Sequence, residues 1–190
     1  MINNNEQGFT LIELVVGLVL MVIILSIAVK LLILQRKTFN VQEQVSEMQQ
    51  YIRSSMDAIS REARMAGYNP TGASFNGINV AQTGTFTFSM DNDGNGTITA
   101  SESITYAYDS ANSQIDRNAN DGNGALPFAE NIDNLTFLYY DGDGATTATL
   151  SDIRKIKITI TGRTENIDPI SGEYKYATLT SFVTPKNLDY

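Results

Sequence analysis

The sequence predicts an α+β protein in which one long N-terminal helix packs on a mostly antiparallel β-sheet. Three observations lead to this prediction. An almost wholly apolar segment runs from residue 8 to residue 29, an amphipathic helical pattern follows it without a proline, and alternating apolar and polar segments fill the remainder. Short Gly/Asn/Asp turns separate these alternating segments, which favours antiparallel hairpins.

The apolar segment predicts a membrane anchor. Leu14–Val29 contains sixteen residues without a charge, and Glu13 precedes them. Counted from Phe9, the segment is long enough to cross a hydrocarbon core of about 30 Å as a helix. A cleaved secretory signal would have a shorter apolar core followed by a small-residue cleavage site, and no such site follows here. A carboxylate inside such a helix is costly and normally has a partner. We predict an anchor over residues 9–36.

The amphipathic segment predicts that the same helix continues to residue 66. Apolar residues recur there at steps of three and four, which gives one apolar stripe. Gly67 is a good stop signal, with Pro70 just beyond it. A coiled coil is the alternative, but the strands downstream favour packing on a sheet. The stripe consists of Val41, Val45, Met48, Ile52, Met56, Ile59, Ala63 and Ala66.

Five segments predict strands, and together with the amphipathic helix they predict a globular head over residues 37–190. The strands are expected at 85–90, 103–108, 135–140, 153–161 and 174–184, where apolar side chains alternate or cluster. Residues 67–84 and 109–131 are polar and loop-like, and their sequence assigns them to no clear element. The head then has a helical half, 37–66, and a β-sheet region, 67–190.

Composition excludes several classes of site. The chain has no cysteine and no histidine, so it has no disulfide, no histidine-based triad and no histidine-ligated metal. Its net charge of −8 argues against a nucleic-acid binder. Residues 65–153 contain eleven acidic residues against the single base Arg117, which suggests cations or basic partners. No nucleophile elbow or phosphate loop is present, and we predict that the protein is not an enzyme.

The segment "DNDGNGTITASE", residues 91–102, matches the calcium-loop pattern D-x-[DN]-x-[DN]-G-x5-E in full. Its oxygen atoms could supply the six to eight ligands that Ca²⁺ prefers. A solvated Asx/Gly turn is the alternative reading. The loops that begin at Asp116 and Asp141 match less well, and whether they bind ions stays open. The predicted ligands are Asp91, Asp93, Asn95, the Thr97 carbonyl, Thr99 and Glu102.

The stretch "GFTLIEL" resembles the N-terminal signature of type IV prepilins and type II secretion pseudopilins. The resemblance implies that residues 1–8 are a leader, that a prepilin peptidase cuts between Gly8 and Phe9, and that Phe9 is then N-methylated. It also implies that the Glu13 carboxylate lies near the N-terminal amine of a neighbouring subunit in the filament. The implied location is the bacterial inner membrane, with the head outside the cytoplasm, and the pilus filament. The implied partners are other pilins and the assembly platform.

Two further stretches resemble a branch of this family. "SMDAISREARMAGY" (55–68) and "TPKNL" near the C-terminus are similar to PilW-like minor pilins and to the related minor pseudopilin GspJ. The resemblance implies a minor pilin that initiates pilus assembly and sits at the tip. The alternatives are a GspJ-like pseudopilin of a type II secretion system and a calcium-binding, membrane-anchored surface module.

Overall fold

The computed structural model describes residues 9–188, and the chain divides into two units after Glu43. Helix α1 (Leu11–Arg64) forms the described structure of the first unit and enters the second. The sequence predicted a helix over 9–66, so each end differs by two residues, which is the usual uncertainty of helix boundaries. The second unit, residues 44–190, contains every strand.

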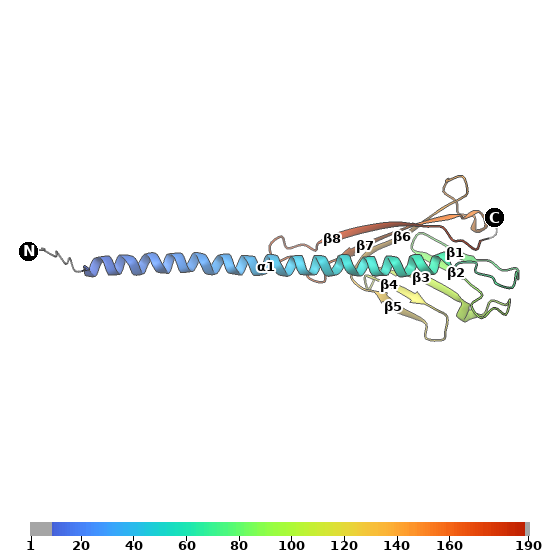
Figure 1. Ribbon diagram of the computed structural model, residues 1–190, viewed down its shortest axis with the longest axis horizontal. Helices are drawn as coiled ribbons and strands as arrows, with labels where there is room; N and C mark the ends of the chain where they lie inside the picture. Colours follow the sequence, from blue (N-terminus) through green and yellow to red (C-terminus); the bar gives the residue numbers. More distant parts are fainter. Residues whose placement is uncertain (1–8, 189–190) are drawn as a thin grey trace, which may run out of the picture. The chain divides into compact units, whose positions relative to one another are not determined.

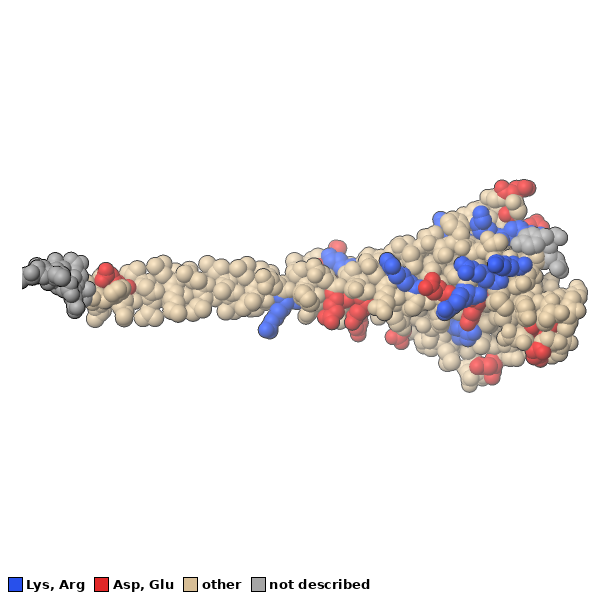
Figure 2. All heavy atoms as spheres, viewed as in Figure 1, with Lys and Arg blue, Asp and Glu red and all other residues tan. Residues whose placement is uncertain are grey.

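The first unit has the surface of a membrane-spanning or filament-core helix. Every large apolar side chain from Leu11 to Leu34 is exposed. Among the described residues, α1 is the one helix long and apolar enough to cross a membrane. On the face that Figure 2 shows, most of this segment is tan, with the acidic side chain of Glu13 near its start; the segment also contains one base, Lys30. A helix that is apolar on all sides needs lipid or other protein around it.

The second unit contains two antiparallel sheets, where the sequence predicted one. The larger sheet follows chain order, β1-β2-β3-β4-β5, and the smaller sheet has the order β6-β7-β8. Short 3₁₀ turns, η1 (Ala100–Glu102) and η2 (Leu150–Asp152), precede β3 and β7. The strands are β1 (Ile78–Ala81), β2 (Thr85–Ser89), β3 (Ser103–Asp109), β4 (Gln114–Asn118), β5 (Ala125–Ala129), β6 (Ile132–Tyr140), β7 (Lys155–Arg163) and β8 (Tyr176–Val183).

The loop-like residues 67–84 and 109–131, which the sequence assigned to no element, contain β1, β4 and β5. Strand β4 has one fully buried apolar residue, Ile115, so it has no visible alternation. Strand β5 contains Pro127, which is tolerated because β5 is an edge strand. Strand β1 is only four residues long. Each of these strands is stabilised mainly by pairing with its neighbours, and its own sequence shows little apolar/polar alternation.

The predicted stripe is confirmed from Met48 to Ala63 of α1, where its apolar residues are buried, and Ala66, just after the end of α1, is buried as well. Figure 1 shows this half of α1 with β6, β7 and β8 on one side and β4 and β5 on the other. Residues from both sheets join the stripe in one hydrophobic core. Strand β7 is the central strand of its sheet, and its Ile156, Ile158 and Ile160 are fully buried.

Two contacts fix α1 against the two sheets. On the smaller sheet, Gly162 of β7 lies so close to α1 that an added Cβ would meet Cγ2 of Ile52 at 2.6 Å. On the larger sheet, the Arg117 guanidinium donates to both carboxylate oxygens of Glu62, at 3.1 and 3.0 Å. The hydroxyl of the buried Tyr106 donates to the same carboxylate at 2.8 Å. Burial raises the pKa of Tyr106, so its hydroxyl stays protonated and remains a donor.

The close approach at Gly162 predicts that Gly162→Ala destabilises the protein by about 1–3 kcal/mol, because the helix must move away from β7. Denaturant unfolding of the full-length protein in detergent, followed by circular dichroism, measures this change. Gly84→Ala is the matched control, since a Cβ there has no atom within 4 Å, and its effect should stay within about 0.5 kcal/mol. Equal stability of the two variants would contradict the close contact.

Candidate functional site

The first candidate site is the start of α1, where Thr10 and Glu13 cap the helix reciprocally. The Thr10 N–H and hydroxyl both donate to Oε2 of Glu13, at 2.9 and 2.7 Å. The Glu13 N–H approaches the Thr10 Oγ1 at 3.4 Å. This is a capping box, which satisfies backbone donors that the first turn of a helix leaves free. This role was not predicted from the sequence, although the Thr-x-x-Glu spacing before an apolar run signals it.

Phe9 precedes α1 and lies four residues before Glu13 in the sequence, and it is 83% exposed. Gly8 lies outside the described residues, so the predicted cleavage point has no structural account. The pairing of Glu13 with a neighbouring subunit's amine stays a prediction. Within the chain, the carboxylate already has one role, which is to cap the helix that carries it.

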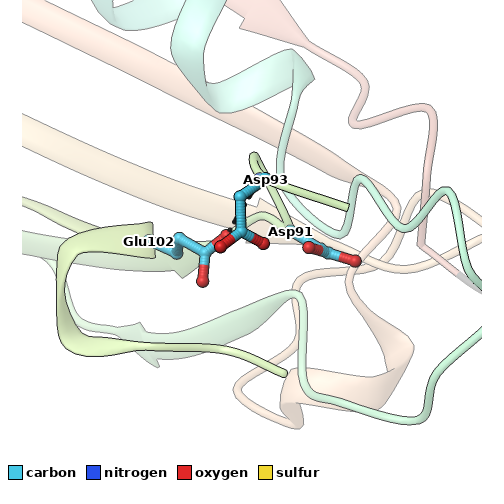
Figure 3. Close-up of side chains that lie close together, drawn as sticks. All are labelled: Asp91, Asp93 and Glu102. Atoms are coloured by element: carbon cyan, nitrogen blue, oxygen red, sulfur yellow. Dashed lines mark hydrogen bonds between the residues drawn. The ribbon is translucent and has the colours of Figure 1, made fainter. Parts of the chain in front are cut away.

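The second candidate site is the loop between β2 and β3, which is joined at its base to the end of α1. The Gly67 N–H donates to the Ser89 carbonyl, and the Asp91 N–H donates to the Tyr68 carbonyl, both at 2.8 Å. Asp91 and Glu102 are buried, at 0% and 5% exposure, whereas Asp93 is exposed. One oxygen from each of the three carboxylates lies within 4.8 Å of the others. Figure 3 shows the Asp93 carboxylate between the other two in this view.

Backbone amides of the loop surround the two buried carboxylates. Asp91 accepts the N–H groups of Gly94, Asn95 and Gly96 at 2.9, 3.1 and 3.0 Å. Glu102 accepts the Thr99 N–H at 2.9 Å, and this bond is the main reason why the pKa of Glu102 is lowered. Each of the four oxygens of these two carboxylates accepts two hydrogen bonds in this structure, so a cation bound there would replace some of these bonds.

The remaining predicted ligands take part in hydrogen bonds within the loop. Asn95 accepts the Thr97 N–H with Oδ1 and donates to Asp93 with Nδ2, each at 2.7 Å. The Thr99 hydroxyl donates to Oε2 of Glu102 at 2.9 Å. The structure therefore brings together three of the six predicted residues, Asp91, Asp93 and Glu102, as a cluster of carboxylates.

One contact of the cluster was not predicted. The Thr71 hydroxyl donates to Oδ2 of Asp91 at 3.4 Å, from a segment twenty residues earlier. No local sequence pattern indicates this contact.

The two weaker loops do not form such a cluster among residues 9–188. Asp116 lies within β4, where it accepts the Gln114 side-chain amide at 2.6 Å. Asp141 accepts the N–H groups of Asp143 and Ala145, at 3.0 and 2.8 Å, and so closes a turn. Within the described residues, the β2–β3 loop is the one place where three acidic side chains approach closely enough to share a cation.

Comparisons with known proteins agree with the motif at the start of α1. The prokaryotic N-terminal methylation motif matches residues 3–29, and the family described as prepilin peptidase-dependent protein B matches residues 41–180. No curated protein matches the chain. Among solved structures, the type IV-like pilin TTHA1219 from Thermus thermophilus is similar, with 10% identity and a TM-score of 0.47. The match covers 74% of this chain and 97% of that pilin.

The two family matches cover complementary parts of the chain. The first lies on the apolar half of α1, and the second extends from the amphipathic half of α1 into β8, over more than half of the sequence. Pilins are structural proteins that associate with one another, and the long helix on antiparallel sheets agrees with such a role. The chain therefore belongs to the prepilin peptidase-dependent protein B family and is a type IV pilin-like protein with a prepilin methylation motif.

Proposed function

We propose that the protein is a PilW-like minor pilin that initiates assembly of a type IV pilus and sits at its tip. A prepilin peptidase removes residues 1–8, and Phe9 becomes the methylated first residue. The mature chain is anchored in the inner membrane, with the second unit outside the cytoplasm, until it joins other minor pilins at the assembly platform. The observation that carries this proposal is "GFTLIEL" at the start of an exposed apolar helix, inside the matched methylation motif.

The exposed apolar surface of α1 supports the proposal. The helix from Leu11 to Leu34 needs cover on every side, first from lipid and then from the equivalent helices of other subunits. Such a helix tolerates a carboxylate only when its charge is compensated. Leader cleavage would leave a positively charged amine on the first residue of every processed subunit. In this chain that residue is Phe9, four residues before Glu13. This supports the pairing between subunits as well as the cap within one chain.

A GspJ-like pseudopilin is the second candidate, because "TPKNL" and residues 55–68 resemble both branches. The two candidates differ in what the loss of the gene affects. A minor pilin is required for normal surface pili, whereas a minor pseudopilin is required for secretion of folded proteins. Genes beside this one that encode other prepilin-motif chains or secretion components would separate the two.

Replacement of Gly8 by Ala should prevent leader removal, because the peptidase cuts directly after this glycine. Mass spectrometry of the protein from membranes should then find residues 1–8 still attached and no N-methylated Phe9. Gly17→Ala, inside the apolar helix where an added Cβ meets no atom within 4 Å, is the control and should be processed normally. A methylated Phe9 in the Gly8→Ala protein would count against the proposed cleavage site.

Replacement of Glu13 separates its two roles. Glu13→Gln keeps an acceptor for the Thr10 N–H but removes the charge, whereas Glu13→Ala removes both. Both variants should be cleaved normally, and both should fall about tenfold or more in sheared filaments relative to membranes, as loss of ~1.4 kcal/mol would cause. Quantitative immunoblotting of the two fractions measures the ratio. If Glu13→Gln enters filaments as well as the wild type, the helix cap alone matters and the charge pairing is wrong.

We further propose that the β2–β3 loop binds Ca²⁺ through Asp91, Asp93 and Glu102, with Asn95, Thr97 and Thr99 completing the oxygen ligands. Three carboxylates this close repel one another, and a hard divalent cation would relieve the repulsion. The loop is tied to the end of α1 and to β3, so binding would also stabilise the joint between helix and sheet.

The calcium proposal predicts a change in thermal stability. At a Ca²⁺ concentration about one hundred times Kd, the melting temperature of the full-length protein in detergent should rise by about 5 °C or more, and EGTA should reverse the rise. Glu102→Gln should abolish the response. Asp141→Asn, in a loop without the three-carboxylate cluster, should keep it. A melting curve that Ca²⁺ leaves unchanged would remove the site.

A further inference from the structure

The chain contains three Asn-Gly pairs, and the fold constrains them differently. They are Asn76–Gly77 before β1, Asn95–Gly96 in the β2–β3 loop, and Asn123–Gly124 before β5. An asparagine before a glycine is chemically labile, because the glycine has no side chain to hinder attack by its backbone nitrogen on the asparagine amide. In a folded protein, the hydrogen bonds of the two residues and the space around the glycine therefore decide which pair reacts.

Hydrogen bonds protect the pair in the β2–β3 loop. The Gly96 N–H donates to Oδ2 of the buried Asp91 at 3.0 Å. The Asn95 side chain is held as well, because its Oδ1 accepts the Thr97 N–H and its Nδ2 donates to Asp93, each at 2.7 Å. Both reacting groups would have to leave these bonds before they could meet, and the Gly96 N–H would leave a buried carboxylate.

Close packing protects the pair before β1. Gly77 is buried, and an added Cβ would meet Cδ2 of Leu188 at 2.5 Å and Cα of Gly67 at 2.7 Å. The Gly77 carbonyl also accepts the Ser89 N–H at 3.0 Å. The backbone of Gly77 therefore cannot rotate toward the Asn76 side chain without displacing its neighbours.

The pair before β5 has neither protection. Asn123 and Gly124 are exposed, and an added Cβ at Gly124 would meet no atom within 4 Å. Among residues 9–188, nothing accepts a hydrogen bond from the Gly124 N–H. The N–H and Nδ2 of Asn123 donate to Asp121 of the same turn, at 3.1 Å each. Figure 1 shows this turn projecting from the end of the β4–β5 hairpin.

The turn gives Asn123 room to move and no competitor. Gly122, on its other side, also has open space where a Cβ would stand. The neighbouring Asp121–Gly122 pair could cyclise in the same way only with a protonated carboxyl group, because a carboxylate resists attack by a nucleophile. The hydrogen bonds from Asn123 lower the pKa of Asp121, so its side chain stays ionised and unreactive.

We propose that Asn123 is a site of spontaneous deamidation, while the fold protects Asn76 and Asn95. The reaction needs only the exposed turn and water, so the proposal does not depend on the role of the chain in a filament. The product adds one negative charge to a protein that already carries a net charge of −8.

The reaction has two steps. In the first, the Gly124 nitrogen loses its proton to solvent and attacks Cγ of Asn123; the N–Cγ bond forms, the Cγ–Nδ2 bond breaks, and Nδ2 leaves as ammonia after taking up a proton. The product is a five-membered succinimide ring. In the second step, water adds to one of the two ring carbonyls, and the ring opens to aspartate or to isoaspartate. The sum is amide plus water giving carboxylic acid plus ammonia, and no atom is oxidised or reduced.

Both products alter the β4–β5 turn. The bond from Nδ2 of Asn123 to Oδ2 of Asp121 is lost, and two carboxylates then face each other. Isoaspartate also lengthens the backbone of the turn by one carbon atom. Strand β5 pairs with β4 alone, so the change should loosen this edge hairpin and leave the core around α1 intact.

Ageing of the full-length protein in detergent tests the proposal. The folded protein is incubated in mildly alkaline buffer, samples are digested under acidic conditions, and mass spectrometry measures deamidation at each Asn-Gly pair. Asn123 should react at least about tenfold faster than Asn76 and Asn95, which corresponds to a barrier lower by ~1.4 kcal/mol. In urea that unfolds the chain, the three rates should become similar. The rate at Asn123 should rise with pH, because the attacking nitrogen must first lose its proton.

Two matched substitutions assign the charge change to one residue. On isoelectric focusing, the aged wild type should develop a more acidic form, and freshly prepared Asn123→Asp should migrate with that form. Asn123→Ser should not develop it. Asn76→Ser, which also removes an exposed Asn-Gly asparagine, is the control and should develop the acidic form at the wild-type rate.

Three results would overturn the deamidation proposal. The first is a folded protein in which Asn123 reacts no faster than Asn76 or Asn95. The second is an acidic form that persists in aged Asn123→Ser. The third is a rate at Asn123 that equals the other two in the folded chain and exceeds them only in urea, because the turn would then have no part in the selectivity.

Discussion

The buried stripe of α1 between Met48 and Ala63 is the contact on which the rest of the second unit depends. The two sheets share no ladder, and backbone hydrogen bonds join them only locally, for example from Ile132 and Phe137 of β6 to the carbonyls of Ser113 and Thr83. They meet instead in one core that the helix completes. Gly162 lets the helix lie directly on the smaller sheet, while Glu62 binds Arg117 of the larger one. Both contacts belong to the same helix, so the positions of the two sheets are coupled. A displacement of α1 at one contact also displaces it at the other.

Before residue 35 the same helix is exposed, and no residue among 9–188 covers its apolar side chains. Polar groups there need partners within the helix, and Ser26 shows the simplest solution: its hydroxyl donates to the Val22 carbonyl at 2.7 Å. Glu13 cannot be satisfied as simply, because a hydrogen bond does not cancel its charge. The capping box stabilises the first turn, yet the carboxylate remains an anion beside an apolar surface. This remaining charge is the physical reason for the proposed pairing of Glu13 with an amine of another subunit.

Much of this fold could be predicted from local patterns, and the failures have a common cause. The stripe of α1 and strands β2, β3, β7 and β8 follow helical or alternating periodicity, so they were visible. Strands β4 and β5 were missed because pairing holds them, as Ile115 and Pro127 illustrate. The division into two sheets depends on which strands pair with one another, and local sequence patterns do not give strand partners. The Asp91–Glu102 spacing indicated a cluster, and Thr10–Glu13 could have indicated a cap. The Thr71 contact and the difference between the three Asn-Gly pairs required the three-dimensional arrangement.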